Sequence, residues 1–191
     1  MIRIIGGTAG GRRLRTPTGE HTRPTADRVR EALFSSVESA TGSMSGLRFL
    51  DLYAGSGAVG LEAMSRGAAA VTLVEHDKRA AALIRENARS LGLSAEVLTS
   101  SVAGVLRHAP VAAYDFVFID PPYSLPSEAI VADLAALRAN GWLAQGAAVI
   151  VERATRSGAL GWRDGFVGDR SRRYGETTLW YGHAASPERS G

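Results

Sequence analysis

The sequence predicts an α/β fold: a doubly wound, seven-stranded, mostly parallel sheet with a C-terminal antiparallel hairpin and a small N-terminal extension of a β-hairpin and a helix. Three observations predict it. Short apolar segments alternate with longer helix-like segments across 47–153. A glycine-rich loop follows the first apolar segment, as in nucleotide-binding βαβ units. The segment 161–183 has no helical periodicity and predicts two strands at one edge of the sheet.

The elements are expected in the following order. Segment 2–17 predicts a hairpin turned by glycines, and a helix is expected from residue 25 to about 37. Five strands are expected at 47–53, 69–75, 95–99, 114–120 and 147–153. Helices are expected between them, at 59–67, 77–92, 101–108 and 127–140. Asp77 is placed to cap the second of these, and Gly92 to end it.

The pattern divides the chain into three parts. Residues 1–40 form an arginine-rich extension, 41–183 the core, and 184–191 a flexible tail. The chain has 191 residues, 45% of them hydrophobic, which suits one ordinary domain with a sizeable core. No apolar run approaches the roughly 20 residues that span a bilayer, and no secretory leader is evident. We therefore expect a cytoplasmic protein with no membrane contact.

The cysteine and charge content narrows the chemistry. The chain has no cysteine, which excludes disulfides, thiolate nucleophiles and thiolate metal sites. The net charge is only +3, but arginines gather near the N-terminus, where the candidates for RNA contact are Arg3, Arg12, Arg13, Arg15 and Arg23. Guanidinium groups suit phosphate contact and base stacking. The arginines could also merely solvate a surface, but their clustering favours a nucleic-acid surface.

The loop DLYAGSGAVG contains Gly55, Gly57 and Gly60 in the spacing G-x-G-x-x-G. It joins a strand to a helix, and Glu75 ends the next strand. By spacing alone this could be a dinucleotide site, with glycines letting the backbone approach a pyrophosphate. The loop therefore predicts a nucleotide-like cofactor but does not distinguish between the possible cofactors.

Asp51 distinguishes between the cofactors. It ends the first core strand, where a carboxylate would repel a pyrophosphate and attract the ammonium group of S-adenosylmethionine. Glu75 can then accept hydrogen bonds from ribose hydroxyls. The structural alternative is that Asp51 caps a helix and Glu75 faces water. Because Asp51, the glycines and Glu75 occur together at the expected positions along the chain, the sequence favours S-adenosylmethionine over this alternative.

The tetrad Asp120, Pro121, Pro122 and Tyr123 follows the fourth core strand. Ligands of such sheets bind beyond the carboxyl ends of the strands. The prolines have no amide N–H, so the turn presents a carboxylate and a carbonyl that only accept. This suits a planar amine, and Tyr123 offers a ring for stacking a base. Alone, the two prolines could simply end a strand.

Together these motifs resemble the class I S-adenosylmethionine-dependent methyltransferases, a Rossmann-like family, in the branch that carries an [N/D]-P-P-[Y/F] tetrad and modifies amino groups. The segments IRIIGG, GRRL and RPTADRVREALF are similar to those of the small-subunit (16S) ribosomal RNA guanine-N2 methyltransferases. The likeness also includes FVFIDPPY and NGWL and covers nearly the whole core.

The resemblance implies roles for individual residues. It places the methionine part of the cofactor on Asp51, Ala54, Gly55 and Gly57, and the ribose on Glu75. His76, Ser101 and Val102 would flank the adenine, although relatives often have an Asp or Asn after the third strand, where this chain has LTSSVAG. Arg23, Thr25 and Arg30 are candidates to contact the methionine carboxylate, unless that helix is simply an exposed charged one.

The expected reaction is one methyl transfer from S-adenosylmethionine to the exocyclic N2 amine of a guanine in 16S ribosomal RNA, leaving S-adenosylhomocysteine. Asp120 and the Pro121 carbonyl would orient the amine, and no metal is needed. We expect a monomer acting on RNA in a partly or fully assembled small subunit. The alternatives are a DNA adenine-N6 methyltransferase, an NAD-binding oxidoreductase, which leaves Asp51 and the tetrad unexplained, and a non-catalytic RNA-binding module.

Overall fold

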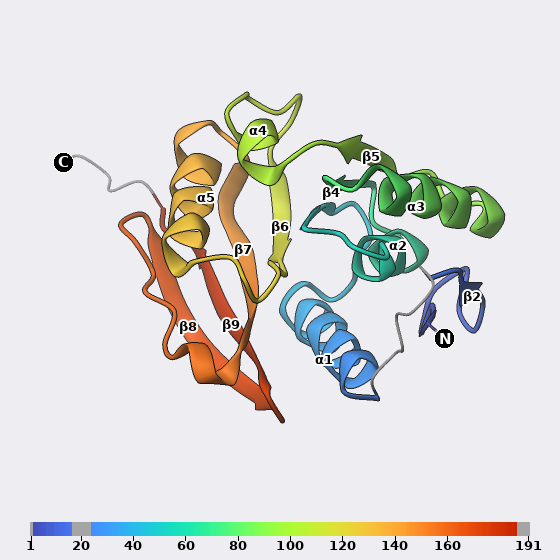
Figure 1. Cartoon of the computed structure of the whole chain (residues 1–191), viewed down its shortest axis with the longest axis horizontal. Helices are drawn as coiled ribbons and strands as arrows, with labels where there is room; N and C mark the ends of the chain where they lie inside the picture. Colours follow the sequence, from blue (N-terminus) through green and yellow to red (C-terminus); the bar gives the residue numbers. More distant parts are fainter. Residues whose placement is uncertain (1, 17–23, 187–191) are drawn as a thin grey trace.

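The computed structural model describes residues 2–16 and 24–186, and it confirms the predicted fold class. The seven-stranded sheet has the order β5-β4-β3-β6-β7-β9-β8 (Figure 1). Strands β3 to β7 run parallel to one another. β9 is antiparallel to β7, and β8 is antiparallel to β9. The strands are β3 (Arg48–Leu52), β4 (Ala70–Glu75), β5 (Glu96–Thr99), β6 (Tyr114–Ile119), β7 (Leu143–Ala154), β8 (Phe166–Tyr174) and β9 (Thr177–Ala184).

Helices cover both faces of this sheet. Buried residues of the first three helices form one apolar cluster with one face, and those of the last two form a second cluster with the other face. The helices are α1 (Pro24–Thr41), α2 (Ala58–Ser65), α3 (Lys78–Leu91), α4 (Val102–Leu106) and α5 (Ser127–Ala139), with a short 3₁₀ turn η1 (Thr155–Ser157) after β7. Within the described residues no helix is long and apolar enough to cross a membrane.

Local sequence accounts for the best predicted boundaries. The Asp77 side chain accepts hydrogen bonds from the backbone N–H groups of Arg79 and Ala80, which caps α3 as expected. Gly92 ends the same helix in the left-handed region, with φ of 69°. Every residue of β6 except Asp115 is buried, which is why this strand appears in the sequence as a continuous apolar run.

The N-terminal extension forms the predicted hairpin. β1 (Ile2–Arg3) and β2 (Arg13–Leu14) pair antiparallel in a separate two-stranded sheet. Helix α1 continues to Thr41, beyond the expected end near residue 37. It ends there because Gly42 takes φ of 80° and its N–H donates to the carbonyl of Glu38.

The C-terminal hairpin β8–β9 lies at the edge of the sheet, as predicted, with β9 against β7 (Figure 1). β7 begins at Leu143, before the predicted start at 147, because a register irregularity lets it pair with the first residue of β6. Its last residue, Ala154, pairs with Thr177 next to the hairpin turn. The turn of the hairpin is therefore brought to the carboxyl end of β7.

Candidate active site at the carboxyl ends of β3, β6 and β7

Three carboxylates on neighbouring strands line one cavity of about 250 Å³. Asp51 lies in β3, Asp120 directly follows β6, and Glu152 lies near the end of β7. Ile119 is paired with Val151, so Asp120 and Glu152 follow adjacent positions of two parallel strands. The two predicted acids are brought together as the sequence indicated, and Glu152 is an addition that the sequence analysis missed.

Asp51 is a buried carboxylate, 2% exposed, with one hydrogen-bond donor among the described residues, the N–H of Gly60 at 2.9 Å. Burial raises its pKa to about 7; the Gly60 hydrogen bond opposes this and the charge of Glu75 adds to it. No arginine, lysine or histidine of the described chain lies within salt-bridge distance of it. A cation entering the cavity would therefore find an uncompensated carboxylate.

The glycine loop is held by Glu75. One oxygen of this buried carboxylate accepts from Gly55 N–H at 2.8 Å, and the other accepts from Asp77 N–H at 2.8 Å. Gly55 has φ of 55°, and a Cβ built on it would meet no atom within 4 Å, so this backbone borders open space. Ala54 and Gly55 line the cavity, whereas a Cβ on Gly57 would lie 2.9 Å from Ile84. Gly57 thus allows close packing of α3 on the loop.

The tetrad forms a rigid turn at the edge of the cavity. Pro121 is buried, and its carbonyl accepts no backbone hydrogen bond from the part of the chain that the structure describes. The Pro122 carbonyl, in contrast, accepts from Leu125 N–H at 2.9 Å and closes the turn. The Tyr123 side chain points into solvent and is 66% exposed. Asp120 and the Pro121 carbonyl are therefore available to accept from an amine, and Tyr123 to stack on a base.

Asp120 and Glu152 influence one another electrostatically. Burial, followed by the charges of Glu152 and Asp51, raises the pKa of Asp120 well above its ordinary value. Asp120 as a whole residue is nevertheless exposed, and it lines the cavity, so a ligand can reach it there. Burial raises the pKa of the half-buried Glu152 to about 7. The two acids are therefore coupled in their titration, each with a pKa above its ordinary value.

Glu152 offers no local sequence signal, since it stands in the strand AAVIVER beside an arginine. Its position follows from the register of β7 with β6, which only the folded sheet defines. The three acids do not form a metal site: over 2–16 and 24–186, no group of three or more His, Asp or Glu residues has a suitable arrangement.

Helix α1 closes one side of the cavity and contributes Arg30, which is 5% exposed. The guanidinium donates to the Arg3 carbonyl and, at 3.1 Å, to Asp27. Its Nε lies 3.8 Å from Glu62 and has no hydrogen-bond partner. Burial lowers the pKa of Arg30, with Glu62 opposing the shift. Arg30 therefore brings a positive charge to the cavity lining, where it could attract a carboxylate, although its Nε is buried on the side of Glu62.

Glu62 holds the residues on this side of the cavity in place, and the sequence analysis did not predict a role for it. Its side chain is fully buried in α2 and accepts from the backbone N–H groups of Ile5 and Gly6, each at 2.7 Å. Arg66 completes the network with a salt bridge to Glu62 at 2.8 Å. The network ties the N-terminal hairpin to α2 and so places Ile2 in the cavity lining.

Tyr53, the residue after β3, is the one non-glycine residue with positive φ in the described ranges. Its φ is 62°, and its hydroxyl donates to the buried carboxylate of Asp133 in α5 at 2.5 Å. Burial and Asp133 raise the pKa of this phenol. A side chain held in the left-handed region at a cavity wall is typical of a functional turn.

Several predicted residues lie elsewhere. Ser101 accepts from Gly104 N–H and caps α4, and Val102 is buried in the core, so neither belongs to the lining of this cavity. His76 is exposed beside Glu75, its Nδ1 3.1 Å from that carboxylate. Arg23 lies outside the described residues, as does the side chain of Thr25.

Four N-terminal arginines predicted to bind RNA are exposed, namely Arg3, Arg12, Arg13 and Arg15. Two of them have protein partners. Arg12 donates to the carbonyls of Leu91 and Ser90 at the C-terminal end of α3, and Arg15 lies 3.6 Å from Glu86. The role of these arginines toward RNA stays a prediction.

Comparison with known proteins identifies the family. A family model described as Conserved hypothetical protein 95 matches residues 2–183. The chain is 39% identical over 161 residues to ribosomal RNA small subunit methyltransferase D of Escherichia coli K12, covering 83% of this chain and 77% of that protein. The Haemophilus influenzae protein of the same name is 38% identical over 157 residues, with 79% and 78% covered.

Solved structures of methyltransferases have the same fold as this chain. A putative methyltransferase from Escherichia coli superposes with a TM-score of 0.83 at 32% identity, covering 97% of this chain and 99% of that one. A magnesium protoporphyrin IX methyltransferase from Synechocystis, solved with bound S-adenosylmethionine, has a TM-score of 0.67 at 14% identity over 87% of each chain, which shows the shared fold. The chain belongs to the Conserved hypothetical protein 95 family, together with the relatives named ribosomal RNA small subunit methyltransferase D.

Proposed function

We propose that this protein transfers a methyl group from S-adenosylmethionine to the exocyclic N2 amine of a guanine in 16S ribosomal RNA. One observation carries the proposal: Asp51, a buried carboxylate with no cationic partner among the described residues, and Asp120, the first residue of the acceptor turn, line the same cavity. The first suits a cationic donor and the second suits an amine, so the two reactants of an N-methylation would meet there.

The residues of the cavity fit S-adenosylmethionine. Asp51 would bind its ammonium group and Arg30 its carboxylate, since both residues line the cavity. Glu75 lies outside the lining, behind Gly55, and has free lone pairs for the ribose hydroxyls. Ala54 and Gly55 would border the methionine part. When bound, this group supplies an electrophilic methyl on a sulfonium. Ser101, Val102 and His76 remain proposed contacts for the adenine.

The tetrad would prepare the acceptor amine. Asp120 and the Pro121 carbonyl each accept one N–H of the amine, which turns its lone pair toward the methyl group. Transfer leaves a surplus proton on the nitrogen. The ionised member of the Asp120–Glu152 pair would accept that proton. Stacking of the base on Tyr123 would offset part of the cost of removing it from its own stack, a few kcal/mol.

The choice of ribosomal RNA rests on relatives. The Escherichia coli and Haemophilus influenzae proteins are named as small-subunit ribosomal RNA methyltransferases. We propose the guanine N2 amine from the motifs in the N-terminal segment. We also propose that residues 1–40 contact RNA, that 41–183 form the methyltransferase core, and that the protein acts as a cytoplasmic monomer on partly or fully assembled small subunits.

The test uses tritiated S-adenosylmethionine with purified 16S RNA, assembled small subunits and duplex DNA as separate substrates. Labelled RNA is digested to nucleosides, and N2-methylguanosine is the expected product. N6-methyladenine in DNA, or no transfer to any substrate despite calorimetric binding of S-adenosylmethionine, would overturn the proposal. Asp120→Ala serves as the catalytically impaired control, since it removes the acceptor side chain of the tetrad and should retain cofactor binding.

A further inference from the structure

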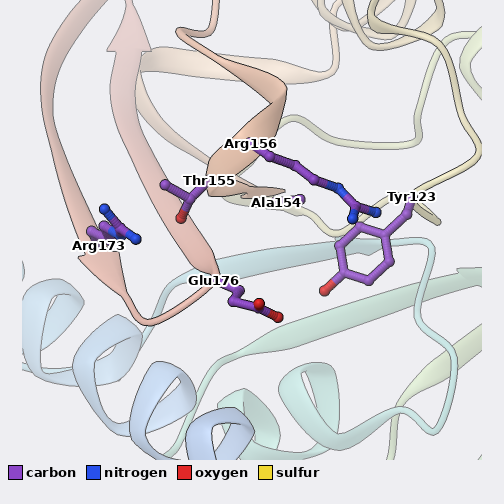
Figure 2. A pocket seen from close by; sticks show the side chains of 6 residues that line it. All are labelled: Tyr123, Ala154, Thr155, Arg156, Arg173 and Glu176. Atoms are coloured by element: carbon purple, nitrogen blue, oxygen red, sulfur yellow. The ribbon is translucent and has the colours of Figure 1, made fainter.

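A second cavity, of about 540 Å³, lies on the solvent side of Tyr123 and is lined by that ring together with Ala154, Thr155, Arg156, Arg173 and Glu176 (Figure 2). We infer that this cavity binds the sugar-phosphate backbone of the RNA strand at the target nucleotide, with Arg156 and Arg173 contacting phosphates. The inference rests on the proposed function, since it concerns the RNA side of the same reaction.

Three separate segments build the cavity. Tyr123 comes from the turn after β6, Arg156 from η1 after β7, and Arg173 and Glu176 from around the β8–β9 turn. The backbone of η1 is tied to that turn, because Thr155 N–H donates to the Glu176 carbonyl at 2.7 Å. A bond at 2.9 Å between the hydroxyls of Thr155 and Thr178 adds to it. These bonds hold the segments that carry Arg156 and Arg173 against one another, so that both arginines line the same cavity.

Both guanidinium groups are available for a ligand. Arg156 and Arg173 are exposed, and neither has an acidic partner within 4 Å among residues 2–16 and 24–186. Arg173 Nε donates to the Gly175 carbonyl at 2.8 Å, which orients the group and leaves its two terminal nitrogens free. In Figure 2 the Arg156 side chain extends toward the Tyr123 ring. Such an arrangement suits the fork geometry with which arginine contacts phosphate.

The position of Tyr123 relates this cavity to the reaction. Asp120 lies only three residues earlier, within about 11 Å of chain. A base that reaches Asp120 past the Tyr123 ring must leave its ribose and phosphates on the outer side, where the arginines lie. Glu176 also enters this cavity, and its carboxylate only accepts, which suits a ribose hydroxyl.

A neighbouring cavity of about 630 Å³ lies between this cavity and α1. It shares Arg173 with the first and adds Arg28 from the exposed side of α1. A hydrogen bond of 2.5 Å from Arg170 to Ser36 holds β8 against α1 at this place. A strand bound at Arg156 and Arg173 could thus extend toward α1, over a surface that presents a third guanidinium.

This surface differs from the N-terminal hairpin that the sequence favoured for RNA. There, Arg12 and Arg15 are engaged with α3. Arg15 is paired there with Glu86, whereas Arg156 and Arg173 have no acidic partner within 4 Å in the part of the chain that the structure describes. We therefore assign the phosphate contacts nearest to the target base to the end of β7 and the β8–β9 turn.

The experiment compares wild type with Arg156→Ala, Arg173→Ala and the double variant, using 16S RNA and small subunits over a series of salt concentrations. Each single variant should bind RNA about fivefold to tenfold more weakly, and the slope of log K against log salt should fall by about one per arginine removed. The KM for RNA should rise, while kcat and the affinity for S-adenosylmethionine stay unchanged. Arg173→Lys should recover part of the affinity because it keeps the charge.

Arg107→Ala is the matched control, because Arg107 is exposed at the end of α4 and lines neither of these two cavities. It should leave the RNA affinity at the wild-type value. Wild-type RNA affinity and salt slope in the double variant would overturn the inference. So would a loss of S-adenosylmethionine affinity equal to the loss of RNA affinity, since that indicates a structural effect. Failure of the proposed function is separate: wild type would then bind S-adenosylmethionine but methylate no RNA.

Discussion

Asp120 and Glu152 stand side by side at the carboxyl ends of β6 and β7, each directly after one member of the register pair Ile119–Val151. Glu152 is the strongest charged influence on Asp120, after burial itself, in raising the pKa of that carboxyl group. Only one of the two acids was recognisable from a motif.

Glu152→Gln should move the acidic limb of the pH–rate profile to lower pH. The neutral amide removes a negative neighbour, so Asp120 ionises more readily and accepts from the amine at lower pH. The maximal rate should fall by about tenfold, because Asp120 or water can still take the proton. The measurement is kcat/KM for tritium transfer between about pH 5.5 and 9. Glu128→Gln, an exposed acid at the start of α5, is the control. An acidic limb that stays in place would contradict the prediction.

Asp51→Asn should stabilise the fold at alkaline pH while weakening cofactor binding. Burial holds the pKa of Asp51 at about 7, above the ordinary value that applies in the unfolded chain. The folded state therefore binds more protons between about pH 4 and 7, so the wild type loses stability as pH rises through this window. The loss amounts to at most about 4 kcal/mol.

Thermal unfolding of wild type and Asp51→Asn at several pH values tests this. The variant should melt higher at pH about 8 and approach the wild type near pH 4. The Gly60 N–H can still donate to the Asn oxygen, so the local geometry is kept. A difference in melting temperature that does not depend on pH would count against a raised pKa of Asp51.

Gly60→Ala should disturb both packing and the site. A Cβ at this position would lie 2.6 Å from the Leu73 side chain and 3.1 Å from the Asp51 carboxylate. Leu73 is fully buried, so its side chain has little room to move away. We expect a loss of about 1–3 kcal/mol of stability. Gly161→Ala is the matched control, because its Cβ meets nothing within 4 Å. Denaturant titration measures both, and equal stability of the two variants would refute the packing argument.

Tyr53→Phe should leave Asp133 without its donor. Asp133 is 4% exposed, and its pKa is raised by burial despite the hydrogen bond from Tyr53. An unsatisfied buried carboxylate costs about 1–3 kcal/mol. The double variant Tyr53→Phe, Asp133→Leu should recover part of the loss, because both polar partners are then removed. If the double variant is less stable than the sum of the single changes, the hydrogen bond is not the cause.

The order of strands and helices could be predicted from local patterns. The continuous apolar run of β6 reflects burial on both faces, and the caps of α3 are satisfied by residues two or three positions away. Asp51 and Asp120 could be placed together because both lie at the carboxyl ends of strands in one parallel sheet, and such strands end at the same edge. The extension of α1 to Thr41 and the early start of β7 were the main differences in boundaries.

The sequence by itself determined the fold class, the glycine loop and the acceptor turn, because each is encoded by residues close together in the chain. The tertiary structure decided which distant residues complete the site. Glu152 is placed beside Asp120 by strand register, Glu62 accepts hydrogen bonds from the N-terminal hairpin, and Arg156 and Arg173 line one cavity because η1 is bonded to the β8–β9 turn. Contacts between residues far apart in sequence depend on packing and charge burial in the finished fold, and no short pattern carries that information.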